Sequence, residues 1–111
     1  MGNTPEGLIK RKVKASLSKF TELHIVWPVP YGYGRQQLDC IVCALGRYIA
    51  IECKAPGREL TQLQKDTIKK IKAANGVVFV IDGTENTDTC DDLEAYLRGL
   101  NRFLEKNYHI K

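Results

Sequence analysis

The chain of 111 residues has no long apolar run, and this absence limits its class. No stretch approaches the roughly 20 consecutive apolar residues that a membrane-spanning helix requires. The segment after Met1 becomes basic rather than apolar, so it does not resemble a secretory signal peptide. We therefore expect a cytoplasmic protein without membrane contact. Residues 1–111 should form a single domain, because a hydrophobic fraction of 43% suffices for one modest core.

The chain also has few of the side chains that bind zinc. The chain has two histidines and four cysteines. Cys40 and Cys43 form a CxxC pair, but residues three apart on a strand point to opposite faces, so they cannot hold one zinc ion together. Cys53 and Cys90 have no partner at metal-ligand spacing. This cysteine usage is typical of a reducing compartment and argues against a zinc site.

Charge is abundant and unevenly distributed. Residues 1–20 carry five basic side chains and one acidic, residues 54–72 carry six basic and two acidic, and residues 82–95 carry six acidic and no basic ones. This uneven distribution predicts a basic face that binds a polyanion and an acidic face that points away from it. Two solvent-exposed helix faces would give the same composition. The candidates for nucleic-acid contact are Lys10, Lys14, Tyr33, Arg35, Arg58, Lys65 and Lys69.

Three charged residues occupy strand-like positions that normally hold apolar side chains. Asp39 precedes the run 40–43, and Glu52 and Lys54 follow the apolar run 48–51. A hairpin loop at Gly46-Arg47 would set Asp39 opposite Lys54, which is the register we expect. A loop at Leu45-Gly46 would set Asp39 opposite Glu52 instead. Because side chains alternate with period two, both registers place the three residues on one face.

Two neighbouring carboxylates repel each other unless a cation bridges them. Carboxylate oxygens are the ligands that Mg²⁺ and Mn²⁺ prefer, and a lysine beside them could orient or deprotonate a water molecule. The pattern therefore predicts a hydrolytic site directed at phosphate. The simpler alternative is a salt-bridged hairpin at the rim of a sheet.

The rest of the chain predicts the order helix, three strands, helix, strand, helix. The first helix begins at Thr4-Pro5, and a capping box formed by Thr61 and Gln64 opens the second. A strand–helix–strand unit predicts locally parallel pairing, hence an α/β sandwich around a mixed sheet. The expected ranges are a strand at 23–29, a helix at 62–74, a central buried strand at 77–81 and a helix from Asp91 or Asp92 to about Lys106.

Glu6 on the first helix, Asp39, twelve intervening residues and then Glu52-Cys53-Lys54 resemble the PD-(D/E)XK nuclease superfamily. More narrowly, the chain is similar to the VRR-NUC group, the virus-type replication and repair nucleases, especially its short stand-alone phage and bacterial members. The resemblance covers about residues 4–81 and includes the Gly46–Gly57 segment. One departure is Gln37-Leu38, which stands before Asp39 where the superfamily's name has a proline.

The resemblance implies a restriction-endonuclease-like fold and a DNA endonuclease that requires Mg²⁺ or Mn²⁺, in a bacterial or phage-infected cell. Asp39, Glu52 and the main-chain carbonyl of Cys53 would bind the metal, and Lys54 would position the attacking water. Glu6 would reach the site directly or through a water molecule, or would only interact with the helix dipole. Gln64 would support the site in addition to its capping role.

We further expect a homodimer, because cutting both strands of DNA needs two sites. The last helix is a candidate interface, unless it simply covers the sheet. The sequence contains no motif of a kind that recognises DNA bases. We therefore expect cutting that is selective for DNA structure, with four-way or other branched DNA as the first candidate substrate. The competing class is a non-catalytic DNA-binding or assembly module whose acidic segment, residues 82–95, binds a partner protein. A small-phosphate hydrolase is less favoured, because no phosphate-cradling glycine loop opens a helix.

Overall fold

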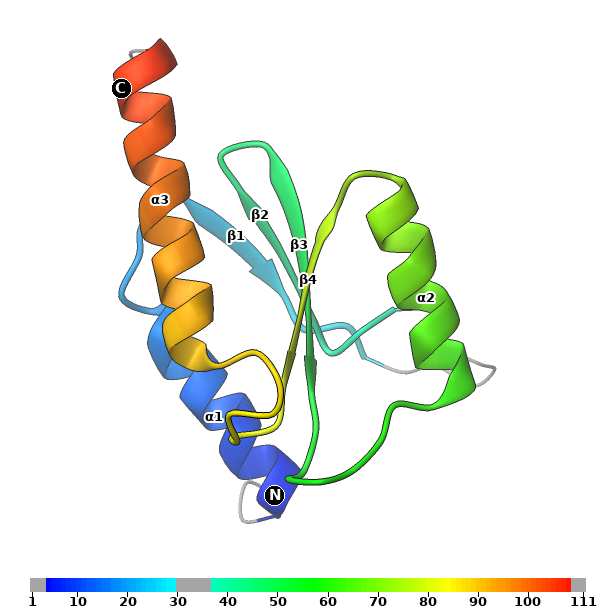
Figure 1. Ribbon diagram of the computed structural model, residues 1–111. Helices are drawn as coiled ribbons and strands as arrows, with labels where there is room; N and C mark the ends of the chain where they lie inside the picture. Colours follow the sequence, from blue (N-terminus) through cyan, green and yellow to red (C-terminus); the bar gives the residue numbers. More distant parts are fainter. Residues whose placement is uncertain (1–3, 30–36, 109–111) are drawn as a thin grey trace.

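A computed structural model of the chain describes residues 4–29 and 37–108, with side chains described as far as Arg102. The predicted order of elements is confirmed (Figure 1). The strand expected at 23–29 is shorter than predicted, and the last helix is longer. The elements are α1 (Pro5–Leu17), β1 (Leu23–Val26), β2 (Cys40–Ala44), β3 (Arg47–Cys53), α2 (Gln62–Ala73), β4 (Val77–Ile81) and α3 (Cys90–Tyr108).

The helices begin and end at the capping signals of the sequence. Thr4 is the N-cap of α1, with Pro5 in the first helical turn, and its hydroxyl oxygen accepts a hydrogen bond from the N–H of Gly7 at 3.0 Å. At the end of α2, Asn75 adopts a φ of 70° and Gly76 donates its N–H to the carbonyl of Ile71 at 2.8 Å. This is a Schellman termination, which turns the chain toward β4.

The four strands form one mixed sheet in the order β1-β2-β3-β4. β1, β2 and β3 are antiparallel neighbours, and β4 pairs with β3 in parallel, so the predicted parallel pairing across α2 is confirmed. The predicted central position of β4 is wrong, because β4 is an edge strand of the described sheet. Its continuous apolar run is explained by packing against both faces of the strand, not by hydrogen bonding to a neighbouring strand on each side.

The hairpin between β2 and β3 has the register that we considered as the alternative. Ala44 pairs with Arg47, so the loop is Leu45-Gly46 and the expected loop at Gly46-Arg47 is wrong. Leu45 and Gly46 have φ values of 52° and 87°, the left-handed conformations that a type I′ turn requires. This turn twists in the same sense as the two strands, and it sets Asp39 across from Glu52.

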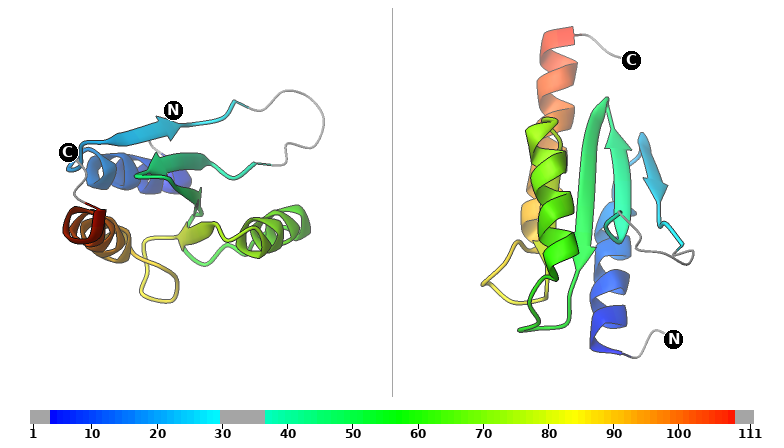
Figure 2. Two further views of the ribbon diagram at one scale, coloured as in Figure 1. Left: turned by 90° about the horizontal axis from the view of Figure 1, so that it is seen from above. Right: turned by 90° about the vertical axis from the view of Figure 1, so that its right-hand side faces the viewer.

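Helices cover both faces of the sheet. α1 and α3 lie side by side against one face, whereas α2 lies over the β4 side of the other (Figure 2). The predicted inward residues Leu93 and Leu97 are buried, but Leu63 is 38% exposed, because α2 packs mainly against one strand at the edge. The core lies between the sheet and the α1–α3 layer, and it includes Ile9, Val13, Leu17, Val42, Ile49, Ile51, Ile81, Leu93 and Leu97. No helix in the described part of the chain is long and apolar enough to cross a membrane.

Candidate active site

Three predicted site residues meet at one end of the sheet, where β2 starts, β3 ends and the first turns of α1 and α2 lie nearby (Figure 1). Asp39 directly precedes β2, and Glu52 is the penultimate residue of β3. Lys54 continues the strand ladder, since its N–H donates to the carbonyl of Ile81 at 3.0 Å. All three side chains are buried, with 8%, 4% and 9% exposure for Asp39, Glu52 and Lys54. The predicted grouping on one face is thus consistent with the observed register.

Each carboxylate accepts a hydrogen bond from the main chain of the opposite strand. The N–H of Asp39 donates to Oε1 of Glu52 at 3.2 Å, and the N–H of Cys53 donates to Oδ2 of Asp39 at 2.9 Å. The backbone of the hairpin therefore helps to hold both acids in place. Their orientation is fixed before any ligand arrives.

Burial and the nearby acid change the protonation of Glu52. Burial, and then the negative charge of Asp39, raise the pKa of Glu52 to about 7. The N–H of Asp39 and the ammonium of Lys54 act in the opposite direction and lower the pKa of this carboxyl. Glu52 thus exchanges a proton near neutral pH, which is a property of residues in functional sites.

Gln64 holds Glu52 from the first turn of α2 and caps that helix as well. Its Nε2 donates to Oε2 of Glu52 at 2.8 Å, while its Oε1 accepts from the N–H of Thr61 at 2.9 Å. The N–H of Gln64 in turn donates to the hydroxyl oxygen of Thr61 at 3.1 Å. The two roles weighed from the sequence therefore coexist in one side chain, which ties the start of α2 to the acidic pair.

From the other side, α1 contributes a lysine that links Glu6 to Asp39. The ammonium of Lys10 lies 3.6 Å from Oε2 of Glu6 and 3.9 Å from Oδ1 of Asp39. Sequence reasoning assigned Lys10 to nucleic-acid contact and missed this position. The four-residue spacing of Glu6 and Lys10 indicated their pairing. No local signal could reveal the approach to Asp39, 29 positions further along the chain.

The cysteines near the site belong to the core. Burial, and then the charge of Asp39, raise the pKa of the Cys40 thiol to about 12, and the same causes raise that of Cys53. Both thiols are therefore neutral and inert at physiological pH. Cys40 is buried and Cys43 is exposed, as the opposite-face prediction requires. The role predicted for the carbonyl of Cys53 stays a prediction.

The other candidates for nucleic-acid contact are dispersed. Arg58, Lys65 and Lys69 are exposed on α2 and the loop before it, and α2 is the helix whose Gln64 reaches Glu52. Lys14 is exposed on α1, with its ammonium 5.0 Å from the centre of the Trp27 ring. The positions of Tyr33 and Arg35 lie outside the described residues.

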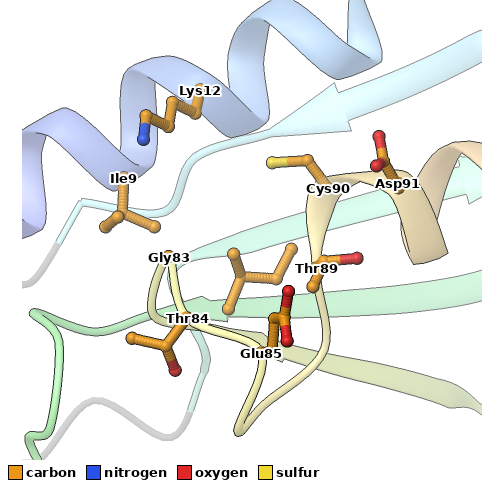
Figure 3. Close-up of a pocket in the computed structure, with 9 residues that line it drawn as sticks. Ile9, Lys12, Gly83, Thr84, Glu85, Thr89, Cys90 and Asp91 are labelled. Carbon is orange, nitrogen blue, oxygen red and sulfur yellow. The ribbon is translucent and has the colours of Figure 1, made fainter.

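A cavity of about 210 Å³ lies elsewhere, between α1 and the loop from β4 to α3 (Figure 3). Ile9 and Lys12 line it from α1, and Gly83, Thr84 and Cys90 line it from the opposite side. It contains none of the buried charged residues described above. Among residues 4–29 and 37–102, no group of three or more His, Cys, Asp and Glu side chains could hold a metal ion, so the acids at the sheet end form a pair rather than a full ligand set.

No protein-family model matches the chain, and no curated protein matches it. The functional interpretation therefore depends on the chemistry of the site itself.

Proposed function

We propose that this protein is a metal-dependent deoxyribonuclease of the VRR-NUC type within the PD-(D/E)XK superfamily. The observation that carries the proposal is the pair of buried carboxylates of Asp39 and Glu52, held side by side across a hairpin, with Lys54 two residues beyond Glu52. The order of elements around a mixed sheet supports a restriction-endonuclease-like fold. A purely structural salt bridge accounts less well for two buried acids in mutual contact, because their repulsion costs stability.

The donor set fits a hard divalent cation. Asp39 and Glu52 offer oxygen ligands, and the negative charge of Asp39, after burial, contributes to the raised pKa of Glu52. Asp39, Glu52 and the carbonyl of Cys53 would hold Mg²⁺ or Mn²⁺, with the remaining ligands supplied by water and the DNA phosphate. A bound ion would neutralise charge on the scissile phosphodiester.

The side chains of the chain supply the other parts of the reaction. The ammonium of Lys54 would orient the attacking water and stabilise the negative charge that develops on the phosphate oxygens. Gln64 keeps the carboxylate of Glu52 in one orientation through its 2.8 Å hydrogen bond. Arg58, Lys65 and Lys69 would contact DNA phosphates, which gives affinity without reading sequence.

Internal hydrogen bonds account for much of the acidic segment 82–95, which weakens the case that it serves as a protein-binding module. Asp82 accepts hydrogen bonds from the N–H and hydroxyl groups of Thr84 at 2.8 and 2.6 Å. Asp88 accepts from the N–H of Val80 at 2.9 Å, and Asp92 accepts from the N–H of Thr89 at 2.9 Å. These acids build the loop and the start of α3, so their number does not require a binding partner.

Cleavage of labelled DNA by purified protein tests the proposed activity. We expect cutting with Mg²⁺ or Mn²⁺, none with EDTA, and a loss of at least about 100-fold in rate for Asp39→Ala and Lys54→Ala. Asp39→Ala should still bind DNA with EDTA present, because basic residues elsewhere supply most of the affinity. The exposed acid Asp66 offers a control, and Asp66→Ala should cut normally.

Two results would reject this function. Cleavage that survives both EDTA and Lys54→Ala would exclude the proposed site. Absence of Mn²⁺ binding in calorimetry, together with normal DNA binding, would identify a non-catalytic DNA-binding module on the same fold.

We also propose that the substrate is branched DNA and that the active form is a homodimer. The last turns of α3 extend beyond the sheet (Figure 1), and we propose that a second copy packs against this helix. A panel of linear, nicked, flapped and four-way substrates should show the fastest cutting on a branched one, whereas equal rates on linear duplex would remove that claim. Sedimentation at micromolar concentration should give a dimer, and a monomer both with and without DNA would reject a stable one.

A further inference from the structure

Lys10 lies between a buried acid and an exposed one. Its ammonium is 3.9 Å from Oδ1 of Asp39, which is 8% exposed, and 3.6 Å from Oε2 of Glu6, which is 43% exposed. The Lys10 side chain itself is 38% exposed. It therefore has two anionic partners at once, the buried Asp39 and the exposed Glu6.

The two lysines near the acids differ in their freedom to move. Lys54 continues a strand and is 9% exposed, so its side chain has little room to move. Lys10 projects from a helix on a flexible four-carbon stem, and it can leave Asp39 without any change in the backbone. Because Glu6 stands one helical turn away, the ammonium keeps an ion-pair partner when it leaves.

We propose that Lys10 is a tethered cation that neutralises Asp39 in the metal-free protein and is displaced toward Glu6 when a divalent cation binds. The inference rests on the proposed function, since it assigns a regulator of metal affinity to the same site. Lys10 competes with the ion for one carboxylate oxygen, and its positive charge opposes that of the ion. Glu6 acts as the receiver of the displaced ammonium rather than as a ligand of the ion.

Calorimetric titration of the full chain with Mn²⁺ alone tests the competition. Lys10→Met should bind Mn²⁺ about three- to tenfold more tightly than the wild type, because a competing charge has been removed. Lys10→Arg keeps the charge and should stay within about twofold of the wild type. Lys12→Met on the same helix lines the separate cavity and should also stay within about twofold. Equal or weaker Mn²⁺ binding by Lys10→Met would overturn the inference.

A double-mutant cycle tests the part played by Glu6. Glu6→Gln should weaken Mn²⁺ binding in the wild-type background, because the displaced ammonium loses its partner, and should have no effect in the Lys10→Met background. An equal loss in both backgrounds would show that Glu6 acts on the ion itself and would overturn its role as receiver.

Thermal unfolding gives a readout that is independent of activity. Without metal, Lys10→Met should melt at a lower temperature than Lys12→Met, because the two buried acids lose a neutralising charge, and Mn²⁺ should raise its melting temperature more than that of the wild type. If the wild type binds no Mn²⁺, the proposed function fails and the inference fails with it. If the wild type binds Mn²⁺ and the variants do not differ, only the inference fails.

Discussion

The N–H of Asp39 donates to the carboxylate of Glu52 across the β2–β3 hairpin at 3.2 Å, so the backbone of one acid holds the side chain of the other. The same contact brings two negative charges together in a buried place. Burial, and then the charge of Asp39, raise the pKa of Glu52 to about 7, whereas the buried Cys40 thiol remains protonated. The arrangement costs stability in the metal-free protein, and several measurable properties follow from that cost.

The stability of the metal-free protein should fall as the pH rises from about 5 to about 7.5. Between the ordinary value of 4.5 and the folded value of about 7, the folded protein binds more protons at Glu52 than the unfolded chain does. The free energy of unfolding should therefore decrease over this range, by an amount on the order of 2 kcal/mol, and then level off. Urea unfolding at a series of pH values measures the effect.

Glu52→Gln provides the control for this pH dependence. A neutral amide does not titrate, so the slope between pH 5 and pH 7.5 should largely disappear in this variant. Asp66→Asn changes an exposed acid on α2 and should keep the wild-type slope. A wild-type curve that is flat or rises over this range would contradict the raised pKa.

Substitutions at Thr61 and Gln64 should separate helix capping from support of the site. Thr61→Ala removes one half of the capping box and leaves the bond from Gln64 to Glu52, so we expect a loss of about 1 kcal/mol in stability with little change in cleavage. Gln64→Glu keeps an acceptor for the N–H of Thr61 but sets a third acid against Glu52. It should lower the cleavage rate at least about tenfold, because Glu52 loses its orienting donor.

Cleavage and urea unfolding of these two variants form the measurement. Equal losses of activity in Thr61→Ala and Gln64→Glu would show that Gln64 acts only through the helix. Normal activity in Gln64→Glu would exclude a role in orienting Glu52.

The β2–β3 loop should tolerate asparagine better than its present leucine. Leu45 has a φ of 52°, a conformation that asparagine adopts at lower cost, so Leu45→Asn should gain about 0.5 kcal/mol. Gly46 has a φ of 87° with open space around it, so Gly46→Ala should lose about 1 kcal/mol through backbone strain alone. Urea unfolding measures both changes. Destabilisation by Leu45→Asn would mean that the packing of Leu45 outweighs the turn.

A buried acid outside the candidate site, Glu94, joins the end of α1 to α3. The hydroxyl of Ser16 donates to Oε2 of Glu94 at 2.6 Å, and the ammonium of Lys19 donates to the same oxygen at 3.0 Å. The hydrogen bond from Ser16, followed by that from Lys19, lowers the pKa of Glu94. Its contribution to stability is therefore complete above the ordinary value of 4.5 and disappears as the pH falls through the lower, folded value.

Calorimetric melting of three variants should rank the parts of this contact. Glu94→Ala should lower the melting temperature most, since it leaves Ser16 and its buried surroundings without a partner. Ser16→Ala should lower it by less, and Lys19→Ala least, because the Lys19 side chain is 61% exposed and its charge is screened. Cleavage at 25 °C should be unchanged in all three. The reverse ranking would show that the ion pair between Lys19 and Glu94 contributes most of the stability.

Local sequence signals determined most of the elements. Thr4-Pro5 opens α1, the capping box from Thr61 opens α2, and Asn75-Gly76 ends it, because each signal satisfies end groups of its own helix. The face shared by Asp39 and Glu52 was also predictable. Side chains alternate between the two faces of a strand, and both hairpin registers that we considered leave Asp39 and Glu52 on the same face.

Only the tertiary structure decided the contacts between distant segments. The choice between the two hairpin loops depends on a left-handed conformation at Leu45. Leucine rarely adopts this conformation, and the neighbouring residues do not predict it. The apolar run 77–81 indicates cover on both faces, but the number of neighbouring strands is set by the pairing of the whole sheet. The position of Lys10 beside Asp39 depends on how α1 packs across the sheet end. Residue spacing fixes what a single helix or strand can place together, whereas contacts between elements depend on the packing of all of them at once.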